Sequence, residues 1–223
     1  MFPQQPQQQF RTSGADVQIF YGSGGSANAN QSTWNKPRGI SHIYMMLIGG
    51  GGAGDGSTTG GGSGAVTVWY GAAQNVPESL IVVPSRGLTI NTTVTARFSN
   101  STLTPTALLT ASTASGAFGG AIMNPNQFTA SGFFNSVAGV GGNTGSAGAE
   151  SLTFLSGGSA VAPTTANYGY VTGSGGSANG YFQMQPIIVG IGGASSGSDK
   201  GGIGCGGGIF GIGGQGMVLI ASW

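Results

Sequence analysis

The sequence predicts an all-β protein, and three observations lead to this prediction. Short β-branched and aromatic runs alternate with turns rich in glycine, proline and serine. No segment carries a sustained apolar pattern of 3.6-residue period with helix caps. Glycine supplies 47 of the 223 residues, against an average usage of about 7%. These features favour a glycine-rich β-sandwich or jelly-roll-like module with long loops.

The composition also predicts an assembly. Glycine loses more backbone freedom on folding than other residues, and it has no side chain to bury. Charged residues make up only 5% of the chain, far below the roughly 25% of ordinary domains, so little protects a free monomer from association. We therefore expect neighbouring subunits to supply part of the buried surface.

Residues 1–16 are expected to form an extended attachment segment, followed by one β domain over residues 17–223. The segment is rich in Gln and Pro and cannot fold alone. Either it is disordered or it threads into a partner, with large apolar anchors and with prolines that limit the entropy lost on ordering. The attachment residues in the second hypothesis are Phe2, Pro3, Pro6 and Phe10.

The first residues lack the basic and apolar regions of a secretory signal, and no apolar run has the length of a transmembrane helix. The sequence thus predicts synthesis in a cytoplasm without membrane insertion.

Five strands are expected in the first half of the β domain. The continuous apolar run from Ile43 to Ile48 predicts burial of both strand faces, whereas the run AVTVWY alternates enough for one buried face. The longest β-branched run, from Leu88 to Phe98, has the best strand propensity. The expected strands are Val17 to Tyr21, Ile40 to Ile48, Ala65 to Tyr70, Ser79 to Val83 and Leu88 to Phe98.

The strand pattern is weaker at about residues 99–170, which we interpret as a loop-rich insertion and an exposed, variable surface. Leu103 to Thr110 and Ser151 to Leu155 are candidate strands within it. A candidate buried patch contains Phe128, Phe133 and Phe134. Two further expected strands, Tyr181 to Val189 and Met217 to Trp223, complete the domain.

The charge balance disfavours nucleic acid as a partner. Six Lys and Arg residues against five Asp and Glu give a net charge of +1, too little for a basic patch that neutralises phosphates or anchors to a membrane. Cys205 has no partner for an intramolecular disulfide and is interpreted as a small residue packed among glycines rather than a reactive thiol. One cysteine and one histidine, His42, do not complete a metal site, and no cofactor is expected.

Two patterns resemble catalytic motifs, and neither has the context that it needs. Gly49, Gly51 and Gly54 match G-x-G-x-x-G after a strand, but the next residues, DGSTTGGGSG, cannot form the helix that would hold a pyrophosphate. The G-x-S-x-G match around Ser195 lacks a downstream histidine to act as base. Asp55 is interpreted as a solvated turn residue rather than a cation ligand. We expect no enzymatic activity and no catalytic residues.

The glycine runs are expected to pack closely. A strict three-residue repeat, as in packed polyglycine or collagen-type helices, is absent. We interpret the runs as tight loops at strand ends, where missing side chains let backbones of one or several chains approach. The candidate packing residues are Gly49, Gly50, Gly51, Gly52, Gly206, Gly207 and Gly208.

The stretch STWNKPRGISHIYMMLIGGGGAGDG resembles the opening of the glycine-rich domain of tailed-phage tail fibres and other virion proteins: a tryptophan, a turn with proline, an apolar strand and a glycine loop. Trp34, Pro37, Ile43 to Ile48 and Gly49 to Gly52 fill these places. The ending GGQGMVLIASW is similar to the family's last glycine loop, strand and tryptophan. The resemblance covers the two ends of the chain and hardly the middle. It implies a homotrimer on a virion appendage and supplies no catalytic residues.

These observations predict a virion structural protein, a subunit of a fibre, spike or capsid-associated appendage of a bacteriophage or other virus. Its N-terminus would attach it to other virion proteins, and its loops would face a neighbouring subunit or the host surface. The alternative is a glycan-binding adhesin, whose aromatic side chains stack on sugar rings. The candidate receptor contacts are Trp69, Tyr168, Tyr170 and Tyr181, with Tyr70 as a further candidate for stacking.

Overall fold

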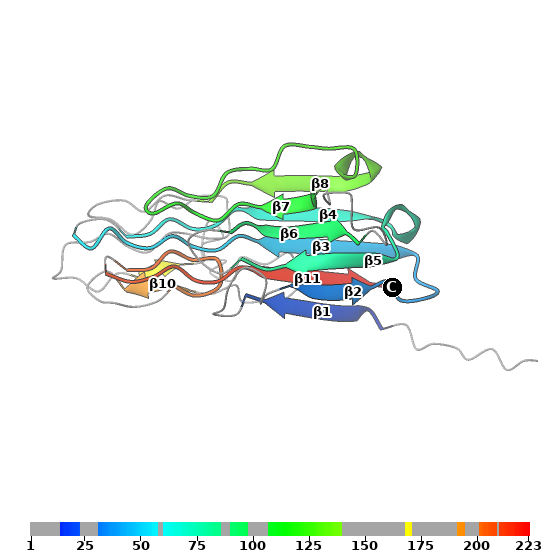
Figure 1. Ribbon diagram of the computed structural model, residues 1–223, viewed down its shortest axis with the longest axis horizontal. Coiled ribbons are helices and arrows are strands. Elements are labelled where there is room, and N and C mark those ends of the chain that lie inside the picture. Colours follow the sequence, from blue (N-terminus) through cyan, green and yellow to red (C-terminus); the bar gives the residue numbers. More distant parts are fainter. Residues whose placement is uncertain are drawn as a thin grey trace, which may run out of the picture.

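A computed structural model of the chain describes residues 14–22, 31–57, 60–85, 90–97, 107–139, 168–170, 191–194, 201–208 and 210–223. Its described part is all-β, with two antiparallel sheets and a short two-stranded ribbon, as the sequence predicts (Figure 1). The ribbon pairs β9 (Tyr168–Tyr170) with β10 (Ile191–Ala194). No helix within these ranges is long and apolar enough to cross a bilayer.

The larger sheet has five strands in the order β1, β11, β3, β4, β8. Its central strands β3 and β11 bury nearly every residue, because both faces of the sheet are covered. The last strand of the chain therefore lies between two early ones. The bounds are β1 (Asp16–Tyr21), β11 (Met217–Ser222), β3 (His42–Ile48), β4 (Val66–Ala72) and β8 (Gly132–Val137).

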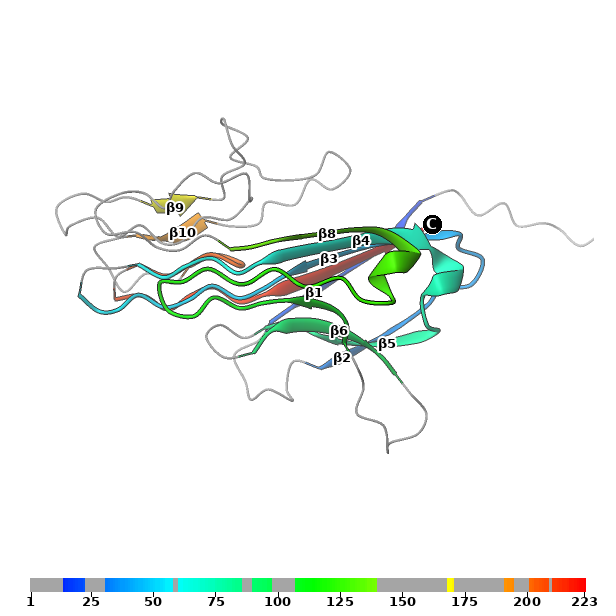
Figure 2. The same cartoon turned by 90° about the horizontal axis from the view of Figure 1, so that it is seen from above.

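The smaller sheet has four strands in the order β2, β5, β6, β7. Its strands alternate buried and partly exposed residues, which is the pattern of a sheet with one covered face (Figure 2). The bounds are β2 (Ser32–Asn35), β5 (Ser79–Val83), β6 (Thr92–Ala96) and β7 (Ala107–Ala111).

The main core lies between the two sheets. It combines inward side chains of the larger sheet, such as Met45 and Trp69, with those of the smaller sheet, such as Trp34 and Leu109. A direct hydrogen bond also joins the sheets, because the buried Thr67 Oγ1 of β4 donates to the Thr110 carbonyl of β7 at 2.7 Å. The other face of the larger sheet carries a second apolar cluster, which includes Tyr44, Met217 and Cys205.

The strands of the larger sheet have two distinct ends. Asp16, the start of β3 and the end of β11 lie at one end, which we call the terminal end. The end of β3, the start of β4 and the start of β11 lie at the other, where glycine-rich segments continue from the strands (Figures 1 and 2). The predicted attachment segment precedes β1 in the sequence, so the chain enters β1 at the terminal end.

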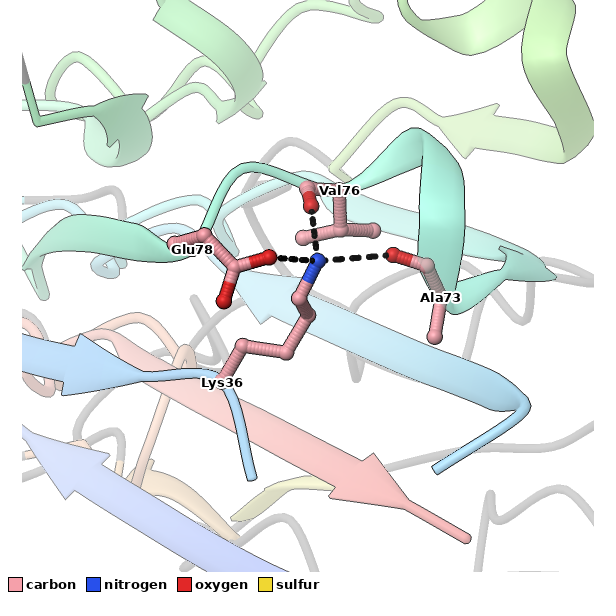
Figure 3. Close-up of polar contacts among 4 residues, drawn as sticks. All are labelled: Lys36, Ala73, Val76 and Glu78. Carbon is pink, nitrogen blue, oxygen red and sulfur yellow. Dashed lines mark hydrogen bonds and ion pairs between the residues drawn. The ribbon is translucent and has the colours of Figure 1, made fainter. Parts of the chain in front are cut away.

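A partly buried lysine fixes the connection between the sheets at the terminal end (Figure 3). The Lys36 ammonium, which follows β2, donates to the carbonyls of Ala73 and Val76 at 3.3 and 2.9 Å and pairs with Glu78 at 2.6 Å. These carbonyls belong to the 3-10 turn η2 (Ala73–Asn75) and the residue that follows it. Lys36 thereby ties the turn that leads from β4 to β5 back to β2.

The strand predictions were largely confirmed, with differences of three kinds. The predicted strand at Ser79 to Val83 matches β5, whereas β2, β8, β9 and β10 were not predicted as strands. β4 buries side chains on both faces, so the single buried face predicted for AVTVWY was wrong. Phe133 is 62% exposed, so the predicted buried patch contains only the other two phenylalanines.

The predicted insertion at about residues 99–170 contains β7 and β8, which form an edge strand of each sheet. β8 follows the short 3-10 turn η3 (Thr129–Ser131). The candidate strands at 151–155 and 181–189 lie outside the described residues.

Candidate functional site

Glycine-rich segments gather at the end of the sheets opposite the terminal end, and we call this element the glycine bundle. It comprises residues 49–54, 60–65, 112–120, 201–208 and 211–216. The segments continue from β3, β4, β7 and β11, so the two sheets position them side by side. They are joined to one another by backbone hydrogen bonds.

Many hydrogen bonds of the glycine bundle recur every third residue. In three pairs of neighbouring segments, which run antiparallel, a step of three residues along the donor segment matches three along the acceptor. The bonds from Gly201 to Ile212 and from Gly204 to Gln215 have the same three-residue step, but there the two segments run parallel. A β ladder has a period of two, whereas three residues make one turn of a polyproline II helix, which has no internal hydrogen bonds. The donor and acceptor pairs are Gly49 with Ala65 (2.9 Å), Gly52 with Gly62 (2.8 Å), Gly51 with Gly214 (2.8 Å), Gly54 with Gly211 (3.0 Å), Gly61 with Gly207 (3.0 Å) and Gly64 with Gly204 (2.8 Å).

Single segments bond to more than one neighbour. The Gly52 N–H donates to the Gly62 carbonyl at 2.8 Å, while the Gly52 carbonyl accepts from the Gly207 N–H at 3.0 Å. The Gly62 N–H in turn donates to the Gly116 carbonyl at 2.8 Å. The glycine bundle is therefore a three-dimensional network of extended backbones, not a further sheet.

The close approach of these backbones requires glycine. A Cβ atom added at Gly51 would overlap the Cys205 carbonyl, and one added at Gly213 would overlap the Gly51 carbonyl. The predicted packing residues Gly49 to Gly52 and Gly206 to Gly208 are all buried in this bundle. The interpretation that missing side chains allow close approach is thus consistent with the structure.

The absence of a strict three-residue sequence repeat was the wrong reason to set aside polyglycine-type packing. The sequence has no strict three-residue glycine repeat, yet the hydrogen bonds have a three-residue period. The period arises from backbone geometry and does not require glycine at every third position.

Cys205 packs inside the glycine bundle as predicted. Its side chain is buried, and its carbonyl accepts a hydrogen bond from the Gly214 N–H at 2.8 Å. Burial raises the pKa of Cys205 to about 12, so the thiol stays protonated at neutral pH. Asp55, at the rim of the bundle, is an exposed turn residue whose Oδ1 accepts from the Ser57 N–H at 2.8 Å.

An aromatic cluster of His42, Tyr70 and Trp223 lies at the terminal end, on the outer face of the larger sheet. The ring centroids are 5.7 to 6.3 Å apart, and the ring planes are within 13° to 20° of parallel. A stack of three layers would place the outer rings about 7 Å apart, because aromatic layers are about 3.5 Å thick. The three rings therefore do not form one column, and each pair is stacked with an offset.

The aromatic cluster is accessible and carries polar groups at its rim. Trp223 is 40% exposed, and Phe133 of β8, which lies opposite Tyr70, is 62% exposed. Ser41 Oγ lies 2.9 Å from His42 Nδ1 and 3.2 Å from the Trp223 carbonyl oxygen. The cluster is thus a partly exposed aromatic surface with hydrogen-bonding groups at its rim.

A groove of about 580 Å³ opens beside Phe128 and the edge of the smaller sheet. Two of its amides are already occupied, because Asn75 Nδ2 donates to the Ser131 carbonyl and Asn126 Nδ2 to the Leu108 carbonyl, both at 3.0 Å. The groove consequently has few free polar groups with which to select a ligand.

Among the predicted receptor contacts, Trp69 is the one whose side chain the structure describes. Trp69 is fully buried and stacks on Phe128 at a centroid distance of 4.8 Å, so it cannot contact a receptor in this structure. Tyr168 and Tyr170 lie on β9, and Tyr181 lies outside the described residues. Tyr70, the further candidate for stacking, belongs to the aromatic cluster. The sequence analysis did not include the other two members of the cluster, His42 and Trp223, among the stacking candidates. The attachment residues Phe2, Pro3, Pro6 and Phe10 also lie outside the described residues.

Neither models of known protein families nor curated protein sequences gave a match to this chain.

Proposed function

We propose that the protein is a structural subunit of a virion appendage, such as a fibre, a spike or a capsid-associated part, with no enzymatic role. The observation that carries this proposal is the glycine bundle. Its buried backbones form a network of hydrogen bonds in which glycines contribute no side-chain chemistry, as suits a rigid packing element. The resemblance of both chain ends to the glycine-rich domain of phage fibres supports the same function.

The arrangement of the strands indicates which end of the subunit would face the particle. The attachment segment enters β1 at the terminal end, and the glycine bundle lies at the opposite end of the same strands. Attachment through residues 1–15 would therefore direct the glycine bundle away from the particle, toward a neighbouring subunit or the host surface. In this proposal the two sheets are a β-sandwich within a homotrimer.

The forces available to such a subunit depend little on salt. Backbone hydrogen bonds hold the glycine bundle, and apolar side chains fill both cores. With 5% charged residues, few surface ion pairs could be screened by dissolved ions. We expect the assembled appendage to tolerate wide changes in ionic strength.

Purified virions provide the first test. The proposal requires the full-length protein to be a stoichiometric component of particles, detected by mass spectrometry of gradient-purified virions. A variant without residues 1–15 should keep the thermal unfolding of the parent, because β1 begins at Asp16, but it should be lost from particles. Normal incorporation of the folded truncation would refute attachment through this segment, and absence of the parent protein from virions would refute the virion function.

Glycan binding is the second candidate function, and the aromatic cluster specifically favours it. The nearly parallel, offset rings form an apolar surface, and the nearby Ser41 hydroxyl and His42 imidazole can hydrogen-bond to sugar hydroxyls. In this alternative the terminal end faces the host, whereas N-terminal attachment would turn it toward the particle.

A glycan array can separate the two functions. The alternative predicts binding by the parent chain that is lost in Trp223→Ala and kept in Phe118→Ala, which removes an exposed aromatic side chain elsewhere. Equal signals from both variants would exclude the aromatic cluster as the sugar site.

A further inference from the structure

β1 is an edge strand whose outer side has no partner. It pairs with β11 over all six residues without a register shift. Within the part of the chain that the structure describes, no strand pairs with its other side. A regular edge of this kind exposes backbone donors and acceptors that can pair with another strand.

The backbone groups that face outward belong to Val17, Ile19 and Tyr21. The Gly22 N–H donates to the carbonyl of Gly216, the residue opposite it, so the hydrogen-bonded positions toward β11 have even numbers. In an antiparallel pair, hydrogen-bonded and non-hydrogen-bonded positions alternate. The odd-numbered residues of β1 must therefore direct their N–H and carbonyl groups to the open side.

The bonds on the other side of β11 agree with this assignment. Trp223 exchanges two backbone hydrogen bonds with His42, at 3.1 and 2.9 Å, so the odd-numbered residues of β11 bond to β3. Its even-numbered residues are left for β1, and they lie opposite the even-numbered residues of β1.

The same three residues expose apolar side chains. Val17, Ile19 and Tyr21 are 45%, 37% and 50% exposed. They lie opposite Ala221, Leu219 and Met217, all members of the outer apolar cluster, so the three side chains extend that cluster to the open edge. Apolar surface and unpaired backbone thus coincide on one strand.

The two edges of the smaller sheet are protected. Carbonyls of β7 accept side-chain hydrogen bonds from Asn126, at Leu108, and from Thr67, at Thr110. β2 has only four residues. β1 has neither device, and no Lys, Arg, Pro or bulge interrupts it. Since proteins usually protect such edges, β1 is suited to pairing in an assembly.

We propose that β1 pairs with β1 of a second copy of this chain, antiparallel and about a twofold axis that passes through Ile19. This register places Val17 opposite the partner's Tyr21 and pairs all three outward-facing residues. Opposite residues of an antiparallel pair point to the same face, so the outer apolar rows of both copies become continuous. The twofold contact is separate from the proposed trimer contact and from the virion function.

Cysteine cross-linking of the full-length chain tests the register. Ile19→Cys would face itself across the axis with Cα atoms about 5.5 Å apart, within the disulfide range. Val17→Cys is the matched control, because the two copies of that residue would be four residues out of register, about 14 Å apart. The native Cys205 is buried and should not compete. Rapid covalent dimerisation of Ile19→Cys alone supports the proposal, and equal or absent cross-linking in both variants overturns it.

Light scattering tests the contact without new cysteines. Ile19→Pro removes an outward-facing N–H and should halve the mass of the parent oligomer, while the ladder to β11 stays intact. Ile19→Lys should have the same effect if the proline variant fails to fold, and Ile122→Ser, which changes an exposed apolar residue elsewhere, should leave the mass unchanged. A monomeric parent, or a mass that the folded Ile19 variants do not change, overturns the proposal.

Discussion

Gly51→Ala should destabilise the protein strongly, because the new Cβ would meet backbone rather than a movable side chain. It would overlap the Cys205 carbonyl and lie 2.8 Å from the Gly206 nitrogen. Relief requires two segments to separate, which strains the bond from the Gly51 N–H to the Gly214 carbonyl. Overpacking costs about 1–3 kcal/mol, and an unpaired buried backbone group costs a similar amount. The sum is roughly 2–6 kcal/mol.

Thermal unfolding measures this loss. For a chain of this size, each kcal/mol lowers Tm by about 2–4 °C, so Gly51→Ala should lower it by roughly 4–24 °C. Gly14→Ala is the matched control, because nothing lies within 4 Å of its Cβ position. Gly39→Ala should be intermediate, since its φ of 76° costs about 1–2 kcal/mol for a residue with a side chain, although the space around it is open. A Gly51→Ala protein as stable as Gly14→Ala would refute the close packing of the glycine bundle.

Two further predictions concern buried polar groups. Lys36→Met should reduce the free energy of unfolding in urea by about 1–3 kcal/mol, because two backbone carbonyls lose their donor, whereas Glu78→Gln should cost less than about 1 kcal/mol because Glu78 is 85% exposed. Equal losses of unfolding free energy in Lys36→Met and Glu78→Gln would contradict the larger contribution assigned to the Lys36 hydrogen bonds. Burial raises the pKa of Cys205 from 9.0 to about 12, so the unfolded chain loses the thiol proton first as pH rises. The free energy of unfolding should fall between pH 9.0 and about 12, and it should fall less steeply in Cys205→Ala than in the parent. Identical pH profiles of the two proteins would contradict the raised pKa of Cys205.

Strand composition was enough to predict most of the two sheets. β5 and the doubly buried β3 follow directly from short apolar runs between turn residues. β2 was missed because four residues are too few to show alternation, although Trp34 is a core residue. The second buried face of β4 depends on what covers the sheet, and a strand's own pattern does not contain that information.

The glycine bundle was predicted only in part. Glycine-rich runs at strand ends indicated close packing at Gly51, but many registers are equivalent when neighbouring residues have no side chains. The three-residue hydrogen-bond period follows from the extended backbone and leaves no sequence repeat of its own.

The aromatic cluster could not be predicted because it joins distant parts of the chain. Trp223 meets His42 only because β11 inserts between β1 and β3. Trp69 and Tyr70 are neighbours in sequence, yet one is buried in the core and the other lies in the exposed cluster, because successive residues of a strand point to opposite faces. The register decides which aromatic residue is accessible.

Amide hydrogen exchange, measured by NMR on the full-length chain, tests the glycine bundle most directly. The amides of Gly51, Gly52 and Gly62 donate to carbonyls of other segments and are buried, so they should exchange as slowly as those of the central strands. The Gly56 amide, in an exposed turn, should exchange rapidly. Rapid exchange of all four glycine amides beside protected strands would contradict a folded glycine bundle, and with it the structural function proposed for the protein.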